Sequence, residues 1–425
     1  MTDLAQQQAA RLKKRNAAEK RFRLYGLGAI VIALTALFIL MISLLSQGGT
    51  AFFTHEMTLD VVLDEAVIDP QNTRDPAIMA RANYNKLVKT SLYAQFENVS
   101  SRREKRKLFG LVSGGAADSL RKLALNSPEL IGQAVTLDVP VSDDVDMFLK
   151  GHIDRETPQE NRRLNDRQIE WIDTLVADGK IERKFNTRFF TSGDSREPEL
   201  AGIWGAVVGS FLTMVVTLAL SFPVAVGAAI YLEEFAPKNR FTDVIEVNIN
   251  NLAAVPSIVY GLLGLAIFLN FFGLPRSAPL VGGLVLALMT IPTIIIAARA
   301  ALKSVPPSIR EAALGIGASP MQSVFHHVLP LAMPGILTGT ILGLARALGE
   351  TAPLLMIGMV AFIVDIPGGI QEPASVLPVQ IYLWVDSPER AFVEKTSAAI
   401  LVLLGFLLLM NGIAIYLRKK FERRW

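Results

Sequence analysis

An arginine and a glutamate stand four residues apart in the stretch GLARALGETAPLLMIG, residues 343–358, inside an apolar run long enough to cross a membrane. If this helix begins at Pro334, Arg346 lies roughly 18 Å along it, near the middle of a bilayer, and Glu350 lies on the same face. A charge at the bilayer centre costs about 2.5 kcal/mol or more, so such residues normally face a protein interior or a water-filled path. A guanidinium also binds oxyanions through two parallel hydrogen bonds. The residues alone therefore leave two interpretations open, an anion pathway and a buried structural ion pair.

A second motif is the polar loop EAALGIGASPMQSVFHHVLPLAMPG, residues 311–335, between two apolar segments. Good helix formers begin at Glu311, glycines including Gly317 break the pattern, and a Ser-Pro pair fits the start of a new helix. The pair Leu329-Pro330 predicts a stop. The spacing predicts two short helices joined by a glycine hinge. The pattern alone favours an amphipathic helix that lies on the membrane surface.

The chain offers little for catalysis or metal binding. It has no cysteine and four histidines, and His55 and His152 are too far apart in sequence to form a recognisable ligand spacing. The adjacent His326 and His327 point to opposite sides of any helix. The phosphate-binding motif GxxxxGK[ST] is absent from the sequence, so any ATP-driven step must take place on a partner. We therefore predict no catalytic residue, no metal site and no cofactor in this chain.

The composition indicates a membrane protein, because 51% of the 425 residues are hydrophobic. The net charge of +3 does not indicate nucleic acid binding, since many basic residues gather at the chain ends beside apolar runs. The first apolar run is too long for a signal peptide and no A-x-A cleavage site follows it. We predict an all-α polytopic membrane protein with six transmembrane helices, at residues 24–46, 202–232, 252–272, 280–302, 334–364 and 396–417.

The basic ends set the predicted topology. By the positive-inside rule both the basic N-terminus, residues 1–23, and the basic tail, residues 418–425, are cytoplasmic, which an even number of spans permits. Residues 47–201 then form an extracytoplasmic insertion between the first two spans, and residues 202–417 form the membrane domain. Its cytoplasmic loop, residues 303–333, contains the motif that begins at Glu311.

The insertion has the pattern of a small α+β domain. TLDVVLD, residues 58–64, and TLDVPV predict strands, whereas residues 75–96 and 165–180 have helical spacing. Asp75 fits the N-cap of the first of these helices. No catalytic constellation stands out, and the simplest interpretation is a folded domain that packs or docks.

Two further features lie within the predicted spans. Arg299 is a few residues from the cytoplasmic end of its helix, so we expect its side chain to snorkel to the head groups. The turn Val255-Pro256-Ser257 predicts a kink in the third span, either to line a path or to fit neighbouring helices.

The motifs together resemble a known family. The order of residues from Glu311 to Pro330, between two spans, resembles the EAA loop of ABC importer permeases, except that His327 stands where the family usually has isoleucine. ARALGETAPLL resembles the corresponding helix of the paired permeases of the phosphate-specific (Pst) importers, most closely the A type. NNLAAVPSIVYGLLG and LVGGLVLALMTIPTIIIAARAALKSVPPSIREAALGIGAS support this resemblance. It covers the chain from Gly202 onward and, loosely, the first helix, but it does not explain the outer insertion.

This resemblance implies a type I permease fold and a role in phosphate import across the bacterial inner membrane. Arg346 and Glu350 map to family residues implicated in phosphate passage. The coupling helix, which would sit in a groove on a cytoplasmic ATPase, maps to Glu311, Ala312, Ala313, Gly317, Leu329 and Pro330.

The implied partners are a second phosphate permease, two copies of an ATP-binding subunit that uses ATP and Mg, an extracytoplasmic phosphate-binding protein and membrane lipid. No nucleic acid is implied. The alternatives are a permease for another oxyanion, such as sulfate, molybdate or phosphonate, and a membrane sensor that uses the outer domain.

Overall fold

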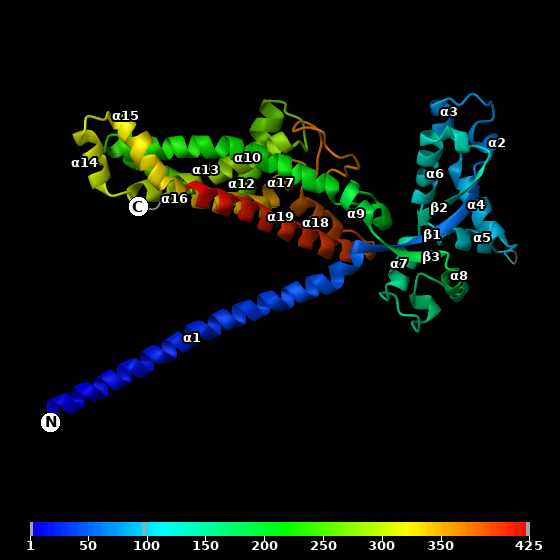
Figure 1. Cartoon of the computed structure of the whole chain (residues 1–425), viewed down its shortest axis with the longest axis horizontal. Coiled ribbons are helices and arrows are strands. Elements are labelled where there is room, and N and C mark those ends of the chain that lie inside the picture. Colours follow the sequence, from blue (N-terminus) through cyan, green and yellow to red (C-terminus); the bar gives the residue numbers. More distant parts are fainter. Residues whose placement is uncertain (1–2, 97–98, 422–425) are drawn as a thin grey trace.

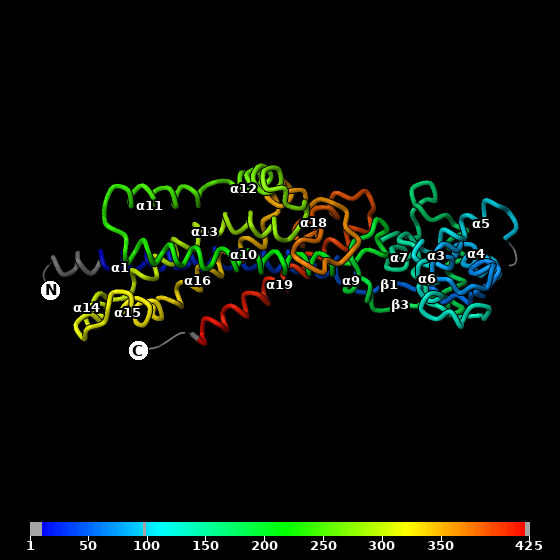
Figure 2. Tube along the Cα trace, turned by 90° about the horizontal axis from the view of Figure 1, so that it is seen from above, coloured from blue at the N-terminus to red at the C-terminus, as the bar shows by residue number. Residues whose placement is uncertain are grey.

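The structure is a computed structural model that describes residues 3–96 and 99–421, with side chains described from Arg11 to Lys420. Residues 422–425 of the predicted basic tail, including Arg423 and Arg424, lie outside the described residues. Four long helices run side by side as a bundle, and a small α+β domain sits at one end of it (Figure 1, Figure 2). The bundle helices are α10 (Trp204–Ile230), α13 (Pro279–Lys303), α16 (Leu329–Gly349) and α19 (Ala391–Phe421).

Helix α1 (Asp3–Gly48) extends from the predicted basic N-terminus through the first predicted span. It leaves the bundle at an angle, so its apolar residues are exposed along most of its length (Figure 1). It meets the rest of the chain near Gly48, where the backbone closely approaches Ala398 of α19. The described residues thus contain five single helices long and apolar enough to span a membrane.

The third predicted span, residues 252–272, is not one continuous helix. The structure has α11 (Arg240–Ala253) and α12 (Ser257–Gly264), which continues as a π-helical segment to Phe271. The two parts are bent by 98°. Pro256 explains the break, because it lacks an N–H and forces the residue before it out of the α region. A count of six spans therefore requires the bent pair to count as one.

The span predicted at residues 334–364 is also wrong in its extent. Helix α16 ends at Gly349, and Glu350 has extended backbone angles. The chain then forms the short helix α17 (Ala352–Met356), a loop, and α18 (Leu377–Val385). Glycine weakens the helix end and Pro353 favours a new first turn, which explains the interruption.

The loop at residues 303–333 forms two short helices, α14 (Pro307–Gly315) and α15 (Pro320–Ser323), as predicted. Gly317 lies between them with φ of 91°, a conformation that glycine adopts readily. The predicted stop at Leu329-Pro330 is wrong. A π-helical turn leads from α15 directly into α16, so Pro330 lies in a continuous helix. Its missing N–H is accommodated by the wider π-helical turn just before it.

The bundle packs through small residues. Gly335 and Gly339 of α16 face Ala301 and Ala297 of α13, and a Cβ atom added at Gly335 would lie 2.6 Å from the Cβ atom of Ala301. Such a small-xxx-small pattern lets two membrane helices approach closely. This packing fixes one face of α16 against α13.

The domain between α1 and α10, called the outer domain after its predicted location, contains a three-stranded antiparallel sheet in the order β2-β1-β3. Its strands are β1 (Phe53–Val62), β2 (Ala134–Pro140) and β3 (Ile181–Phe185). Met57, Leu59 and Val61 alternate along β1 and are fully buried in the domain core. The helices of this domain are α2 (Glu65–Ile68), α3 (Pro76–Ala80), α4 (Tyr84–Ala94), α5 (Arg102–Phe109), α6 (Gly115–Asn126), α7 (Asp143–Leu149), α8 (Asp166–Ala177) and α9 (Thr187–Thr191).

The helix predicted at residues 75–96 is divided into α3 and α4. Asp75 is the N-cap, as predicted, and its side chain accepts a hydrogen bond from the N–H of Ala77. The break occurs because Asn83 caps a second helix, accepting from the N–H of Lys86. The sequence pattern gave no clear signal for this second cap.

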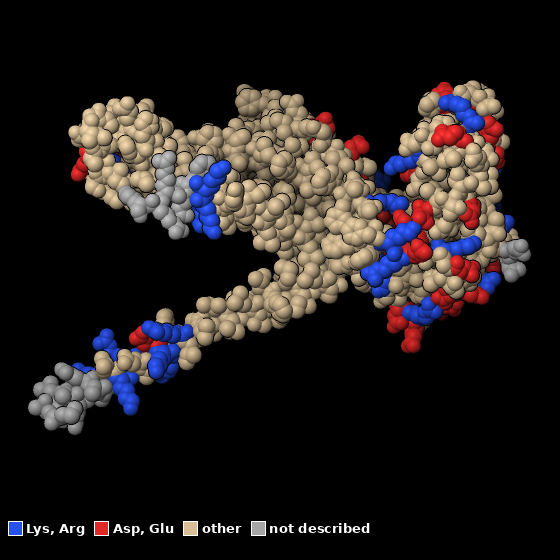
Figure 3. Space-filling view, in the orientation of Figure 1, with Lys and Arg blue, Asp and Glu red and all other residues tan. Residues whose placement is uncertain are grey.

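The outer domain is tied to the first turn of α19 by buried charges. Lys150 Nζ lies 2.9 Å from Glu394 Oε1 and 2.7 Å from Asp146 Oδ2. Lys395 donates a hydrogen bond of 2.6 Å to the carbonyl of Ala201. Figure 3 shows that the surface of this domain carries charges of both signs, whereas the bundle beside it is nearly free of charge on the same face. α14 and α15 lie at the opposite end of the bundle (Figure 1, Figure 2).

Candidate transport and coupling sites

Arg346 lies in the last turn of α16, and its side chain is 54% exposed. Its Nε is 3.4 Å from Oε1 of Glu350, which is the only hydrogen bond of the Arg346 side chain among the described residues. The two residues do not share one helix face as predicted, because the helix ends between them. They still meet, since Glu350 is the residue that caps α16, and the negative end of the helix dipole favours the arginine there.

The exposed residues of α16 form a single stripe. In the second half of α16, Leu342, Arg346 and Gly349 are exposed, while Gly343 and Ala347 on another face are buried. Because the buried face packs against α13, the stripe points away from the rest of this chain. In the membrane, the stripe must therefore face lipid, water or another protein.

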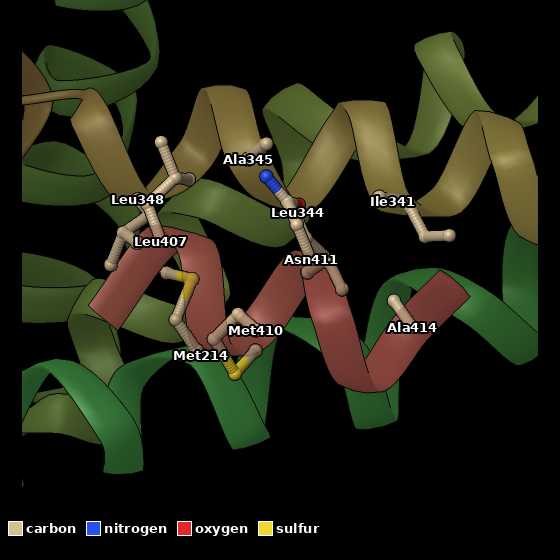
Figure 4. A pocket seen from close by; sticks show the side chains of 9 residues that line it. All are labelled: Met214, Ile341, Leu344, Ala345, Leu348, Leu407, Met410, Asn411 and Ala414. Carbon is tan, nitrogen blue, oxygen red and sulfur yellow. The ribbon is translucent and has the colours of Figure 1, made fainter. Parts of the chain in front are cut away.

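A small cavity lies between α10, α16 and α19, beside the stripe but not on it. Figure 4 shows its lining, which is apolar except for Asn411. Arg346 is not among the lining residues. The cavity therefore does not suit an anion, and its other lining residues are Met214, Ile341, Leu344, Ala345, Leu348, Leu407, Met410 and Ala414.

The predicted coupling residues lie at the other end of α16. Glu311 and Ala312 of α14 are exposed, whereas Ala313 is buried against the protein. Beside them Leu314, Ile316, Met321 and Phe325 expose apolar surface. Leu329 and Pro330 are half-buried in the first turn of α16, so they connect α14 and α15 to that helix instead of forming the exposed surface. The structure does not bring these residues near Arg346, because roughly 30 Å of helix separates the two groups.

Arg299 does not snorkel as predicted. Its Nε lies 3.4 Å from Glu233 Oε2, and its Nη2 lies 2.5 Å from Glu246 Oε1 of α11. Lys303 also reaches Glu233, at 3.6 Å. Carboxylates from α10 and α11 therefore satisfy this cation inside the chain, and the sequence analysis missed them because they are 66 and 53 residues away.

A second missed pair joins Arg310 of α14 to Glu234. Arg310 Nε and Nη2 donate to the two carboxylate oxygens at 3.1 and 2.6 Å. The only sequence signal for these partners is the adjacent pair Glu233-Glu234 at the end of an apolar run, which is typical of a helix end at the membrane surface.

Comparison with known proteins identifies the family. Residues 221–424 match the model of the binding-protein-dependent transport system inner membrane component family. The phosphate transport system permease protein PstA 1 of Mycobacterium tuberculosis is 31% identical over 223 residues, which are 52% of this chain and 72% of that protein. The chain belongs to this permease family. It is a PstA-like subunit of an ABC transporter.

Other relatives agree. PstA of Haemophilus influenzae is 30% identical over 55% of this chain and 81% of its own length. The probable ABC transporter permease YqgI of Bacillus subtilis is 34% identical over 43% of this chain, and the chain spans 60% of that relative's length. Residues 9–159 match a separate family described as a domain of unknown function.

Family membership settles the coarse role of the chain. It is a multi-pass inner-membrane protein and not itself an enzyme, since in such transporters the ATPase belongs to a partner. A substrate-binding partner is likewise implied by a binding-protein-dependent system.

Proposed function

We propose that this chain is a permease subunit of an importer for inorganic phosphate. It pairs with a second phosphate permease, two copies of an ATP-binding subunit that uses ATP and Mg, and an extracytoplasmic phosphate-binding protein. Both termini are cytoplasmic and residues 47–201 face the outside, as the positive-inside rule indicates. The phosphate transport permeases among its relatives support the choice of substrate.

The observation that carries the proposal is the incomplete set of partners of Arg346. Its guanidinium is more than half exposed and donates one hydrogen bond, of 3.4 Å, among the residues that the structure describes. A bare guanidinium facing hydrocarbon is costly, so the stripe on α16 faces a polar path formed with the second permease. The free donors of Arg346 can then hold two oxygens of a passing phosphate in the bidentate geometry typical of arginine.

Glu350 has a supporting role in this proposal. Its carboxylate keeps Arg346 partly neutralised when no anion is present. Phosphate can replace it, because the contact of 3.4 Å is long for a charged hydrogen bond. Glu350 thus holds Arg346 in place, while the other N–H donors of Arg346 remain available to an anion.

The coupling residues act at the cytoplasmic end. Exposed Glu311 and Ala312 contact the ATPase, and Gly317 gives the turn between α14 and α15 its shape. Buried Ala313, together with Leu329 and Pro330, connects this surface to the rest of the bundle. Closure of the ATPases on ATP moves the coupling helix and reorients the helices that line the path.

The test is ATP-dependent uptake by the complete complex in proteoliposomes. Phosphate, sulfate, molybdate and a phosphonate are offered separately, each with a binding protein that recognises it. We expect uptake of phosphate only. Uptake of one of the other oxyanions instead would assign the chain to that substrate. If no oxyanion is taken up although ATP is hydrolysed, the transport proposal is wrong.

A further inference from the structure

We infer that Glu234 and Arg310 form the joint that transmits movement of the coupling helix α14 to α10. Both partners of the pair use two atoms in the contact. The two donors of Arg310 meet the two oxygens of Glu234 in a fork-to-fork arrangement, at 3.1 and 2.6 Å. Glu234 is only 7% exposed and Arg310 is 25% exposed, so water competes little for either group. Such a pair is rigid and directional.

Arg310 also holds the end of α13. Its Nη1 donates to the carbonyl of Val305 at 2.7 Å, and its Nη2 donates to the carbonyl of Leu302 at 3.0 Å. One guanidinium therefore fastens three elements: α10 through Glu234, the C-terminal end of α13, and its own helix α14. A displacement of α14 must move these elements together or break several charge-assisted hydrogen bonds.

The position of Arg310 in α14 links the joint to the proposed ATPase surface. Arg310 directly precedes Glu311, and their side chains project about 100° apart around the helix. Glu311 is exposed, whereas Arg310 is only 25% exposed. Glu311 points to the outside of the chain, and Arg310 points to its interior. A force applied at the exposed side is thus passed on within one residue.

Glu234 is equally well placed at the other side of the joint. It lies in the π-helical turn Tyr231–Phe235, which continues α10 without a break. Such turns often occur at functional positions. Its neighbour Glu233 pairs with Arg299 and Lys303 of α13. The adjacent carboxylates thus have different tasks, since Glu233 ties α10 to α13 and Glu234 ties α10 to α14.

This inference rests on the proposed transport function, and its test uses the double variant E234Q/R310Q in the complete complex. Both charges are removed together, so no buried charge is left without a partner. We expect the complex to assemble and hydrolyse ATP, while phosphate uptake per ATP hydrolysed falls by roughly tenfold or more. The matched control is Lys303→Gln, which removes an exposed cation from Glu233 and should keep the wild-type ratio within about twofold.

A second variant separates the joint from simple folding. The chain has no cysteine, so Glu234→Cys and Arg310→Cys can be combined and joined by a short bifunctional thiol cross-linker. A low ratio of phosphate uptake to ATP hydrolysis before cross-linking, and a partial recovery of this ratio after it, would support the joint.

The inference is overturned if both double variants keep the wild-type ratio of uptake to hydrolysis, or if they lose only assembly with the ATPase. Wild-type complex that hydrolyses ATP without importing phosphate would instead contradict the proposed function, so the two failures are distinguishable.

Discussion

Two arginines of the membrane domain are held in very different ways. Arg310 makes four hydrogen bonds, two to one buried carboxylate and two to backbone carbonyls. Arg346 makes one hydrogen bond, of 3.4 Å, and is more than half exposed. A cation with four of its five N–H donors bonded inside the chain fixes helices relative to one another. A cation with free donors in a membrane helix is available to a group outside the chain.

The surroundings of the two arginines differ in the same sense. At the end of the bundle beside α14, helices α10, α11, α13 and α14 are connected by Arg299, Arg310, Lys303 and their carboxylates. The opposite end of α16 is interrupted at Glu350, and the chain restarts in α17. The comparison therefore assigns transmission of movement to the closed cluster and contact with the substrate to the open end.

The largest expected effect on stability comes from breaking only one side of the closed pair. Arg310→Ala leaves Glu234 buried without its cation, which should destabilise the protein by about 3–5 kcal/mol. Arg346→Ala should have a much smaller effect, since Glu350 stays partly exposed. Thermal unfolding of both variants in the same detergent compares the two, and equal losses would show that the two sites do not differ as described.

A smaller effect is expected from Arg299→Gln. Glu233 keeps Lys303 as a partner and Glu246 is at the surface, so no carboxylate is stranded in the interior. We expect a loss of roughly 1–3 kcal/mol, typical of a hydrogen bond to a charged group. The same unfolding assay measures it. A loss as large as that of Arg310→Ala would mean that Arg299, and not Arg310, is the principal fastening of the cluster.

The smallest effect concerns Glu199, whose carboxyl group burial keeps protonated up to a higher pH. Burial raises the pKa of Glu199, in the outer domain, from 4.5 to about 7. The folded protein then binds the proton more tightly than the unfolded chain does, so the contribution of Glu199 to stability falls as pH rises from about 4.5 to 7 and is constant above that.

We expect the unfolding temperature to decrease by a few degrees over this window, and Glu199→Gln to remove most of that decrease. The measurement is thermal unfolding between pH 5 and pH 8 for both proteins. Parallel curves would show that Glu199 does not titrate in this window.

Much of the membrane architecture follows from local properties of the sequence. Hydropathy identified the first, second, fourth and last spans, and glycine and proline signals identified the two short helices around Gly317. The breaks at Pro256 and Gly349 are harder to predict. The residues on both sides of each break are apolar, and hydropathy does not report a change in the direction of the helix axis. Pro256 predicts a kink, but the bend angle of 98° between α11 and α12 does not follow from the sequence pattern.

The charged sites divide in a similar way. Arg346 and Glu350 are close in sequence, so their contact could be anticipated even though the helix ends between them. The partners of Arg299 and Arg310 are 53 to 76 residues away, and only the fold brings them together. The depth of Arg299 predicts snorkelling, but the fold places the carboxylates of Glu233 and Glu246 within reach of its side chain.

The most direct test of the account is phosphate uptake by the complex that carries Arg346→Gln, with Arg346→Lys as the charge-conserving comparison. The variant keeps the size of the side chain and removes the charge, and no buried carboxylate is left stranded. We predict that Arg346→Gln lowers uptake by about a hundredfold, in line with the loss of a charged bidentate contact. Assembly with the ATPase and the unfolding temperature should be unchanged, and Arg346→Lys should retain partial uptake. Wild-type uptake by Arg346→Gln in an assembled complex would contradict the assignment of Arg346 to the phosphate path.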